Sequence, residues 1–549
     1  MKLRTSFFNQ TALNKNLTRF APAWVLYTVF LLMFFGIMLD GSYLYFAETV
    51  GISLQALSVF NLFYALLCVE LLMGDLFNTR ICNALHAMPV RREGWFVVHT
   101  VSGVLFALIP YATVTLLALP VLRSLWYIAF LWFAGAMLQY LFFFALAMLS
   151  AQCVGQRFAL AVVYGIINLL FLVIYWLVDT LYVPMLHGIV LDQEPFWLLC
   201  PIYTMAENEY IGVDWVNELG TIQNITVTLD EAWGYLGICT LLTAAFFAAA
   251  VLLYRKRALE SAGDFVVVRP AVPVFLVLYT LCCGAGFHLF FSAFLGTDGW
   301  LFLIVGLTVG FFTGKMLLDR SVRVVKAKNI LGFAVLMAAF GASLLLTWLD
   351  PVGLVTWKPD TGDVEYVTVN GANRTQSFRL SEMEDLENVL QIHQQGIEER
   401  FEYDGRRTAT VHLQYRLKNG MRAVRKYQID IGSEAGKLLR SYLSRPEQIF
   451  MEPVTDAEAF AQKVEIYVDG GSVIAHEDMV SLVEAILLDC ASGEMVQDWA
   501  FHPMDDVKEW LEFRIGNKYV SVMVFSSCTN TVKWLQEHDV ETIYSEKFG

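Results

Sequence analysis

The sequence predicts a polytopic α-helical membrane protein that continues into a water-soluble α+β domain. Of its 549 residues, 57% are hydrophobic and 16% are charged, whereas a soluble domain carries roughly 25% charged residues. Residues 1–349 hold 18 basic and 18 acidic side chains, and residues 350–549 hold 20 basic and 34 acidic ones, so the second part carries the whole net charge of −14. The chain therefore divides into a neutral, apolar part and an acidic part of ordinary soluble composition.

Nine apolar stretches are long enough to cross a bilayer, whose hydrocarbon core of about 30 Å needs roughly 20 helical residues. The third stretch contains Pro110 and Pro120, which a membrane helix tolerates when neighbouring groups satisfy the freed backbone. The nine predicted spans are 22–39, 57–77, 95–121, 125–149, 157–178, 233–254, 272–294, 299–318 and 330–349.

The positions of Lys and Arg predict the orientation of these spans, because basic residues accumulate on the cytoplasmic side. With the N-terminus inside, seventeen basic residues of the membrane part face the cytoplasm, and only Arg123 faces outwards. The connection 179–232 lies outside and holds nine acidic residues and no Lys or Arg. Since the number of spans is odd, residues 350–549 are predicted to form an extracytoplasmic domain.

The first 21 residues are polar, with Phe7, Phe8, Leu13, Leu17 and Phe20 at roughly helical spacing. This pattern favours an amphipathic helix on the inner membrane surface over a signal peptide. A frayed polar tail is the alternative.

The C-terminal part carries a weak internal repeat. Residues 365–371 (EYVTVNG) resemble 465–471 (EIYVDGG), and each is followed by an acidic amphipathic helix, 381–399 or 476–492. A hairpin follows in each copy, 408–430 around Asn419-Gly420 and 509–526 around Gly516-Asn517, because such dipeptides favour tight turns. With short helices at 433–444 and 529–538, we predict two β-α-β-β-α modules, 363–450 and 462–545. Chance similarity is the competing explanation.

No catalytic or metal-binding pattern is visible in the C-terminal part. Its five histidines are dispersed without the spacing of metal ligands, and the nine cysteines include no CxxC pair. Cys490 and Cys528 would be able to form a disulfide outside the cell, although two free thiols are favoured. The acidic balance and the lack of basic tracts argue against nucleic acid as a partner.

One string, GFFTGKM at 310–316, superficially resembles a phosphate-binding loop. Its two glycines are one residue too close, Met316 replaces the Ser or Thr that would hold magnesium, and it lies in a predicted span. Gly306, Gly310 and Gly314 instead fit a small-xxx-small face for helix packing. We therefore expect no enzyme activity and no cofactor on this chain.

The cytoplasmic connection after the second span combines charged and apolar side chains. RICNALHAMPVRREGW, residues 80–95, keeps Leu85, Met88 and Val90 among its charges. That composition suits a short amphipathic helix seated in the groove of a partner protein.

These segments resemble the permease subunits of ABC-2-type transporters. FFNQTALNKNLTRFAPAWVLYTVF, residues 7–30, is similar to the start of such permeases, and RICNALHAMPVRREGWFVVH, residues 80–99, to their coupling helix. YRKRALESAGD at 254–264, three extra spans and a C-terminal domain are more narrowly similar to the Ytr-type permeases of Gram-positive bacteria. The resemblance implies a six-span core, 22–257, with a large outer loop 179–232; the three additional spans, 258–349, depart from the ordinary pattern.

The resemblance also implies partners and contacts. ATP and magnesium would be bound by separate ABC ATPase subunits, a second permease of the same or a related kind would complete the path, and the protein would lie in the bacterial cytoplasmic membrane. A loop between the fourth and fifth spans would make a second ATPase contact. The expected contact residues are Asn83, Leu85, His86, Met88, Pro89, Arg91, Arg92 and Glu93 in the first loop and Gln152 to Arg157 in the second.

Charged groups within the spans are candidate functional residues, because a charge in the bilayer is costly and usually faces a partner or cavity. Glu70 fits equally a link in a gate or a structural pair with a neighbouring helix. Asp75 fits an interfacial position, and His99 favours helix packing over proton transfer.

The predicted function is therefore export or extraction of an amphipathic substrate by an ATP-driven transporter. A membrane sensor of an extracellular peptide or envelope component is the first alternative. An ion-driven transporter is another, and it would require Glu70 and His99 to pair. A membrane enzyme would need clustered His, Asp or Glu at the surface, which the sequence does not show.

Overall fold

The structure, a computed structural model, forms two compact units. The first comprises residues 1–177 and 193–338, and the second comprises 178–192 and 339–549. The described residues are 8–38, 46–86, 91–122, 126–191, 199–218, 221–229, 232–257, 263–296, 300–371, 379–399, 407–454, 456–468, 472–474, 476–502, 506–515 and 518–538.

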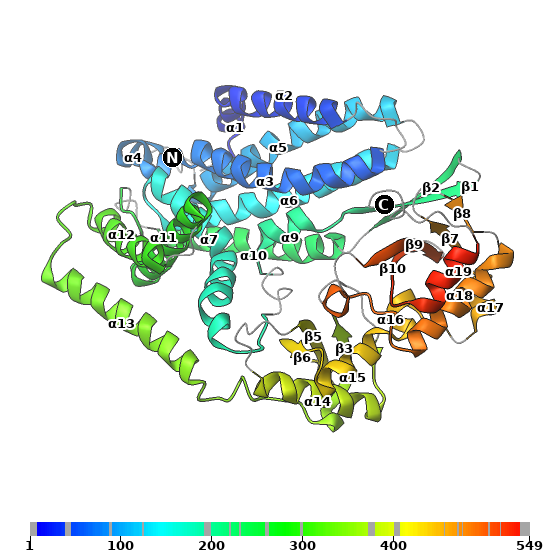
Figure 1. Ribbon diagram of the computed structural model, residues 1–549. Helices are drawn as coiled ribbons and strands as arrows, with labels where there is room; N and C mark the ends of the chain where they lie inside the picture. Colours follow the sequence, from blue (N-terminus) through cyan, green and yellow to red (C-terminus); the bar gives the residue numbers. More distant parts are fainter. Residues whose placement is uncertain are drawn as a thin grey trace. The chain divides into compact units, whose positions relative to one another are not determined.

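The first unit is built of long apolar helices (Figure 1). Within the described residues, eight helices are long and apolar enough to cross a membrane, or nine if the bent pair α1 (Gln10–Arg19) and α2 (Ala21–Met38) is one span. This confirms a polytopic helical protein. Each predicted span overlaps a long helix, but the second, 57–77, is displaced, because the helix there runs from Phe46 to Leu72 and residues 74–77 form a separate turn. Besides α1 and α2, the long helices are α3 (Phe46–Leu72), α5 (Arg92–Leu122), α6 (Trp126–Cys153), α7 (Arg157–Leu177), α10 (Ala232–Lys256), α11 (Ala271–Leu295), α12 (Trp300–Asp319) and α13 (Ala327–Leu349).

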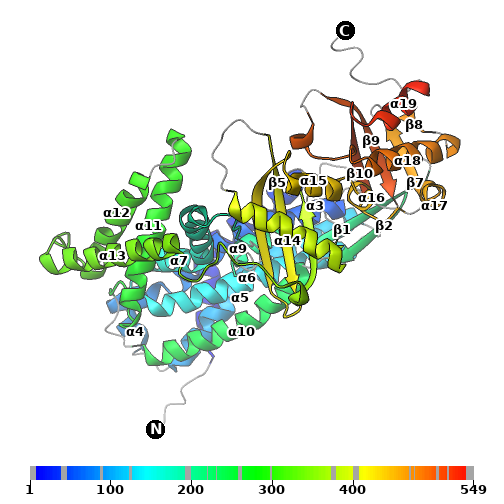
Figure 2. The same cartoon turned by 60° about the horizontal axis from the view of Figure 1, so that its bottom comes forward.

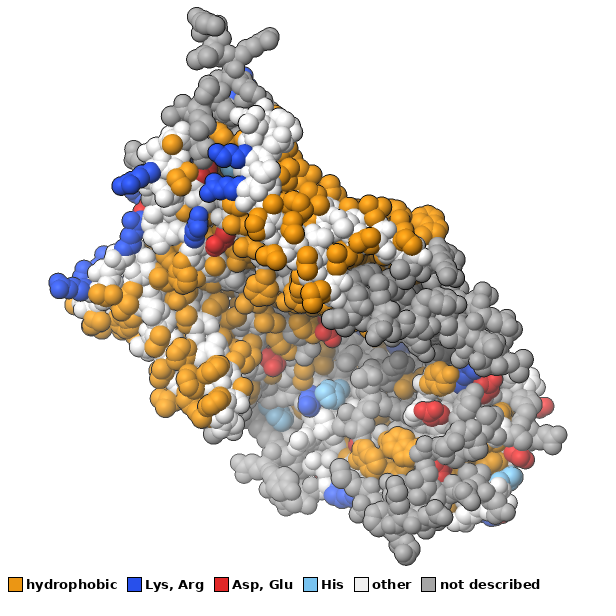
Figure 3. Space-filling view, turned by 90° about the horizontal axis from the view of Figure 1, so that it is seen from above, with side chains coloured by type: hydrophobic (Ala, Val, Ile, Leu, Met, Phe, Trp, Pro, Cys, Tyr) orange, Lys and Arg blue, Asp and Glu red, His pale blue; other side chains and the backbone are white. Residues whose placement is uncertain are grey.

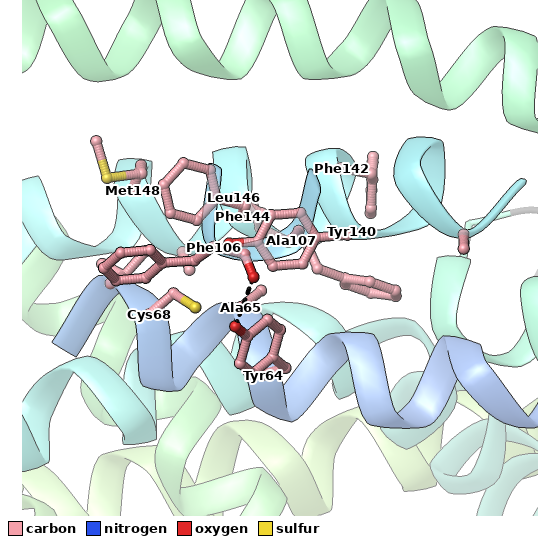
Figure 4. Close-up of a cluster of buried hydrophobic side chains, with 14 of the residues drawn as sticks. Tyr64, Ala65, Cys68, Phe106, Ala107, Tyr140, Phe142, Phe144, Leu146 and Met148 are labelled. Atoms are coloured by element: carbon pink, nitrogen blue, oxygen red, sulfur yellow. Dashed lines mark hydrogen bonds between the residues drawn. The ribbon is translucent and has the colours of Figure 1, made fainter. Parts of the chain in front are cut away.

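Helix α6 is the centre of this unit and packs against α3, α5 and α10. Its buried face contributes aromatic side chains to a core in which Tyr64 donates a hydrogen bond to the carbonyl of Phe106 across to α5 (2.8 Å; Figure 4). The hydroxyl of Tyr140 likewise donates to the carbonyl of Gly103 (2.9 Å). Each polar tip therefore has a partner although the rings are buried, which offsets the cost of burying a hydroxyl.

Helices α11 and α12 pack through the glycines of the GFFTGKM segment. A side-chain carbon at Gly310 would lie 2.6 Å from Cβ of Cys283, and one at Gly314 would lie 2.9 Å from Cδ1 of Leu276. Close backbone approach of this kind needs small residues, so the helix-packing interpretation of this string is confirmed. Helix α13, in contrast, has no buried residue.

The polar connection 179–232 contains regular structure that the sequence analysis did not predict. It includes the short helix α9 (Pro201–Glu207) and an antiparallel hairpin of β1 (Ile211–Glu218) and β2 (Thr221–Leu229). Gln55 of α3 holds the end of α9, since its Nε2 donates to the carbonyls of Glu207 and Asn208 (both 3.1 Å).

The C-terminal part of the second unit consists of two four-stranded antiparallel sheets. In the first, β4 (Arg379–Leu380), β3 (Val364–Asn370), β5 (Thr408–Leu417) and β6 (Arg422–Asp430) lie in that order; in the second, β8 (Ser472–Val473), β7 (Val464–Val468), β9 (Val507–Ile515) and β10 (Lys518–Phe525) repeat it. Both sheets therefore have one topology, as expected of two copies of one module.

Each sheet carries two helices. Helices α14 (Met383–Glu398) and α15 (Glu434–Leu443) pack on the first sheet and on each other, as α18 (His476–Ala491) and α19 (Thr529–Glu537) do in the second half (Figure 2). The Asn419-Gly420 turn joins β5 to β6, with Gly420 at φ +86°; Gly516 and Asn517 lie outside the described residues. The buried Asp489 of α18 caps α19 by accepting hydrogen bonds from the backbone N–H groups of Asn530 and Thr531.

Candidate functional site

The connection after α3 begins with a tight turn and a short, exposed helix. The turn η2 (Gly74–Phe77) follows the end of α3, and α4 (Thr79–His86) follows the turn. Asn78 starts α4, because its Oδ1 accepts from the backbone N–H of Arg80 (3.0 Å). Of the α4 side chains described, Cys82 is buried, and Ile81 is 49% exposed. Helix α4 is thus attached by one buried side chain and presents its other described residues outwards.

Asp75, a residue of η2, faces His99 of α5. Oδ2 of Asp75 lies 3.7 Å from Nε2 of His99, and each side chain is only 8% exposed. This spacing allows an ion pair when the imidazole is protonated, in a site from which water is largely excluded. Asp75 and His99 are therefore brought together, although they are 24 positions apart in the chain, and the turn is tied to α5.

Arg257, which directly follows α10, binds the turn η2 through its Leu76 carbonyl. Its buried guanidinium donates to the carbonyl of Leu76 in η2 (3.3 Å) and to that of Ala151 at the end of α6 (2.6 Å). Arg92 at the start of α5 donates to the carbonyl of Arg257 (2.6 Å), and its guanidinium lies 5.0 Å from the ring centre of Tyr254. One turn is therefore connected to the ends of α5, α6 and α10.

Arg157, the first residue of α7, reaches the same turn. Its Nη2 lies 2.9 Å from the point that a side-chain carbon at Gly74 would occupy, and the guanidinium is close enough to Glu70 to act on its charge. A side chain at residue 74 would require the guanidinium to move from this position. The loop before α7 is paired by backbone hydrogen bonds to residues 263–267, among them Gly155 N–H to the carbonyl of Asp264 (2.8 Å).

The predicted contact residues have different environments. Asn83 and Arg91 are exposed, whereas Gln152 is buried and donates to the carbonyl of Met148 (3.1 Å). Glu93 lies 3.4 Å from Arg255. Leu85 and His86 belong to α4, but the structure does not describe their side chains, and Met88 and Pro89 lie outside the described residues.

A buried polar network, which we did not predict from the sequence, lies inside the helix bundle. Oδ1 of Asn61 in α3 accepts from the hydroxyls of Tyr27 in α2 (3.0 Å) and Tyr111 in α5. Nδ2 of Asn61 donates to Oε1 of Gln139 in α6 (3.1 Å), and Gln139 in turn donates to the hydroxyl of Tyr210 (2.8 Å). Asn and Gln within apolar spans are the signal that would have found it, because uncharged polar groups also need partners there.

In the second unit, the residues that continue α7 are fastened to the first sheet. We call residues 183–191 the strap. Its Gly188 carbonyl accepts from the N–H of Lys426 on the edge strand β6 (2.9 Å), and Ile189 forms an antiparallel bridge with Arg425. The Nε2–H of His187 donates to the carbonyl of Gly396 in α14 (2.9 Å). The strap thus occupies an edge that would otherwise expose unpaired backbone groups.

The second unit contains two buried histidines, His393 in α14 and His502 just before β9. Burial lowers the pKa of His393 to about 4, and nearby Arg425 and Lys358 act in the same direction. Burial likewise lowers the pKa of His502 to about 4, with Arg440 as a further cause. Both side chains are therefore neutral at pH 7. His393 contacts the hydroxyl of Tyr415 (3.0 Å), and the ring of His502 stacks on Phe525.

Cys490 and Cys528 are free thiols in the structure and lie in the core of the second half. Burial raises the pKa of the Cys528 thiol to about 12, and it raises that of Cys490 well above its usual range. Neither thiol is therefore ionised at neutral pH, which makes both poor nucleophiles.

Within the described residues, no group of three or more His, Cys, Asp or Glu side chains is placed to hold a metal ion. Comparison of the chain with models of known families, with curated proteins and with solved structures finds no significant match.

Proposed function

We propose that the protein is the membrane-spanning subunit of an ATP-driven transporter in a bacterial cytoplasmic membrane, with α4 as the element that docks on a separate ABC ATPase. The observation that carries this proposal is the combination of an exposed α4 with its firmly connected base. A helix that transmits force needs an outward face for the partner and rigid links to the spans, and α4 has both features.

The contacts of the turn η2, which precedes α4, indicate which spans would move with α4. Displacement of α4 would act on η2, and from there on α5 through Asp75–His99, on α6 and α10 through Arg257, and on α7 through Arg157. ATP binding and hydrolysis belong to the partner, so this chain supplies no catalytic residue. A second permease would complete the path, because one six-span core does not normally enclose a pore, and an amphipathic substrate fits the apolar spans.

Purification from the native membrane under mild conditions tests the proposal. We expect an ABC ATPase in the purified sample, and we expect the substitution Ile81→Asp on α4 to reduce its amount at least tenfold. Met421→Asp is the matched control, since Met421 is a comparably exposed apolar residue on the β5–β6 hairpin. If no ATPase accompanies the unmodified protein, the proposal is wrong. If both variants lose it equally, α4 is not the contact.

A second candidate is a sensor, in which the C-terminal domain binds an envelope component outside the cell and alters the same spans. The strap favours this sensor, because its residues follow α7 in the chain and bind to β6 and α14 of the C-terminal domain. An ion-driven transporter has less support, because His99 faces Asp75, whereas Glu70 lies beside Arg157.

A further inference from the structure

The segment that joins α12 to α13 is short, basic and partly apolar. Between Lys315 and Lys328 the chain has five basic residues and one acidic residue, Asp319. The connecting residues themselves, 320–326, read RSVRVVK. Val324 anchors the segment, because its side chain is buried in the protein. Its carbonyl accepts a hydrogen bond from Nδ2 of Asn329 (2.8 Å).

Two valines of this segment point away from the protein. Val322 is 80% exposed and Val325 is 71% exposed. They lie between two apolar helices, and α13 has no buried residue along its whole length. Apart from its contacts with Phe311 and Phe312, made by Phe333, and the hydrogen bond between Ser343 and Tyr182, this apolar helix is uncovered and requires lipid around most of its surface. The segment at its beginning would therefore lie at the boundary between the hydrocarbon and the headgroups, where exposed valines can enter the lipid.

The basic side chains of the segment are only partly neutralised by the protein. Arg320 pairs with Asp264, and both remain about half exposed. Arg323, Lys326 and Lys328 are exposed, and within the described residues the structure gives them no ion pair. The first turn of α13 contains no acidic residue. Figure 3 shows that Lys and Arg side chains of this unit gather at one end of its apolar surface.

We propose that this segment is a binding site for anionic lipid headgroups, with Arg323, Lys326 and Lys328 contacting the phosphate groups and Val322 and Val325 entering the acyl-chain region. The charges fit an anionic lipid because three exposed cations, to which the described residues offer no ion pair, lie at the start of an apolar helix with no buried residue. Each basic residue near a membrane surface changes the local preference for anionic lipid by about fivefold. The inference does not depend on an ATPase partner.

Native mass spectrometry of the full-length protein in mild detergent tests this site. Phosphatidylglycerol and phosphatidylcholine with the same acyl chains would be added at equal concentrations, and the number of retained lipids would be counted. We expect preferential retention of phosphatidylglycerol, which falls at least fivefold in the triple variant Arg323→Gln, Lys326→Gln, Lys328→Gln. The charge-conserving variant Arg323→Lys, Lys326→Arg, Lys328→Arg should retain it.

A matched control removes the same charge elsewhere. Lys437→Gln, Lys463→Gln and Lys508→Gln change three exposed lysines of the C-terminal domain and should leave retention unchanged. Equal loss in this control would show that only net charge matters and would overturn the site. Unchanged retention of phosphatidylglycerol in the variant Arg323→Gln, Lys326→Gln, Lys328→Gln would also overturn the site. The same holds if that variant loses a co-purified protein but keeps the lipid.

The unmodified protein offers a test that needs no substitution. At about 0.5 M salt the screening length is only a few ångström, so contacts between exposed cations and headgroups weaken. The preference for phosphatidylglycerol should therefore decrease with salt. A preference that is absent, or that does not depend on salt, would contradict the proposal.

Discussion

Gly188 of the strap packs directly on the ring of Tyr427 in β6. A side-chain carbon at Gly188 would overlap this ring, and the backbone at Gly188 has φ +75°, which L-residues with side chains seldom adopt. The strap therefore seats on β6 only because residue 188 is glycine. Gly396 of α14 is similarly close to Tyr427, so the backbone at two glycines contacts this ring.

The first prediction follows from this contact. Gly188→Val should detach the strap, because overpacking costs about 1–3 kcal/mol and the backbone conformation adds to it. Hydrogen exchange of the full-length protein in nanodiscs should show at least tenfold faster exchange of the Lys426 amide, which the strap protects. Gly362→Val is the control, since no atom lies near a side-chain carbon there. Unchanged protection at Lys426 would refute the described contact.

The second prediction concerns the two arginines that flank Lys256. Arg257 is buried and donates to two backbone carbonyls, whereas Arg255 pairs with Glu93 while more than half exposed. Arg257→Ala should destabilise the membrane unit by about 2–4 kcal/mol because it leaves buried acceptors unsatisfied. Arg255→Ala should cost less than about 1 kcal/mol. Thermal unfolding in nanodiscs compares them, and equal effects would contradict the assigned roles.

The third prediction is a loss of stability of the C-terminal domain in acid. The pKa of His393 and of His502 is about 4 in the folded protein and about 6.5 when unfolded. The unfolded state therefore binds more protons between these values, and stability falls as pH decreases from about 7 to 4.

Each buried histidine should contribute on the order of 3 kcal/mol to this loss. Urea unfolding of the full-length protein at several pH values measures it through the transition of the C-terminal domain. His393→Phe and His502→Phe should each reduce the pH dependence, although either can lower stability at pH 7. An unaltered pH dependence in both variants would show that these side chains do not titrate as described.

The fourth prediction concerns Cys490 and Cys528. Because both thiols are buried and protonated, neither should react with a membrane-impermeant maleimide in the folded protein. Both should react after denaturation without a reducing agent. Mass spectrometry of the labelled peptides measures this. A pair that reacts only after reduction would be a disulfide and would contradict the free thiols of the structure.

The features that the sequence predicted depend on local patterns. Spans follow from length and hydropathy, so each predicted stretch overlaps a helix, and α5 continues through Pro110 and Pro120. The β5–β6 hairpin follows from Asn419-Gly420, whose turn needs a positive φ at Gly420.

The features that sequence reasoning missed depend on contacts between distant residues. Asp75 of η2 and His99 of α5 lie 3.7 Å apart, and no spacing rule in the sequence brings them together. The β1–β2 hairpin was not predicted, because the loop that contains it has no strong turn dipeptide. The contact of the strap with β6 depends on a single glycine that lies far from β6 in the chain. Asn61 and Gln139 carried a readable signal, since two amides in apolar spans require partners.

Helix α4 is the proposed contact for an ATPase, and site-specific photo-crosslinking tests this most directly. A photoreactive amino acid would be placed at Asn83, which is exposed on α4, and in a second experiment at Gln462, which is exposed in the C-terminal domain. After irradiation in the native membrane, we expect a covalent product with an ABC ATPase from position 83 and none from position 462. Failure to form this product at position 83, with cross-linking only to lipid or to another class of protein, would contradict the account.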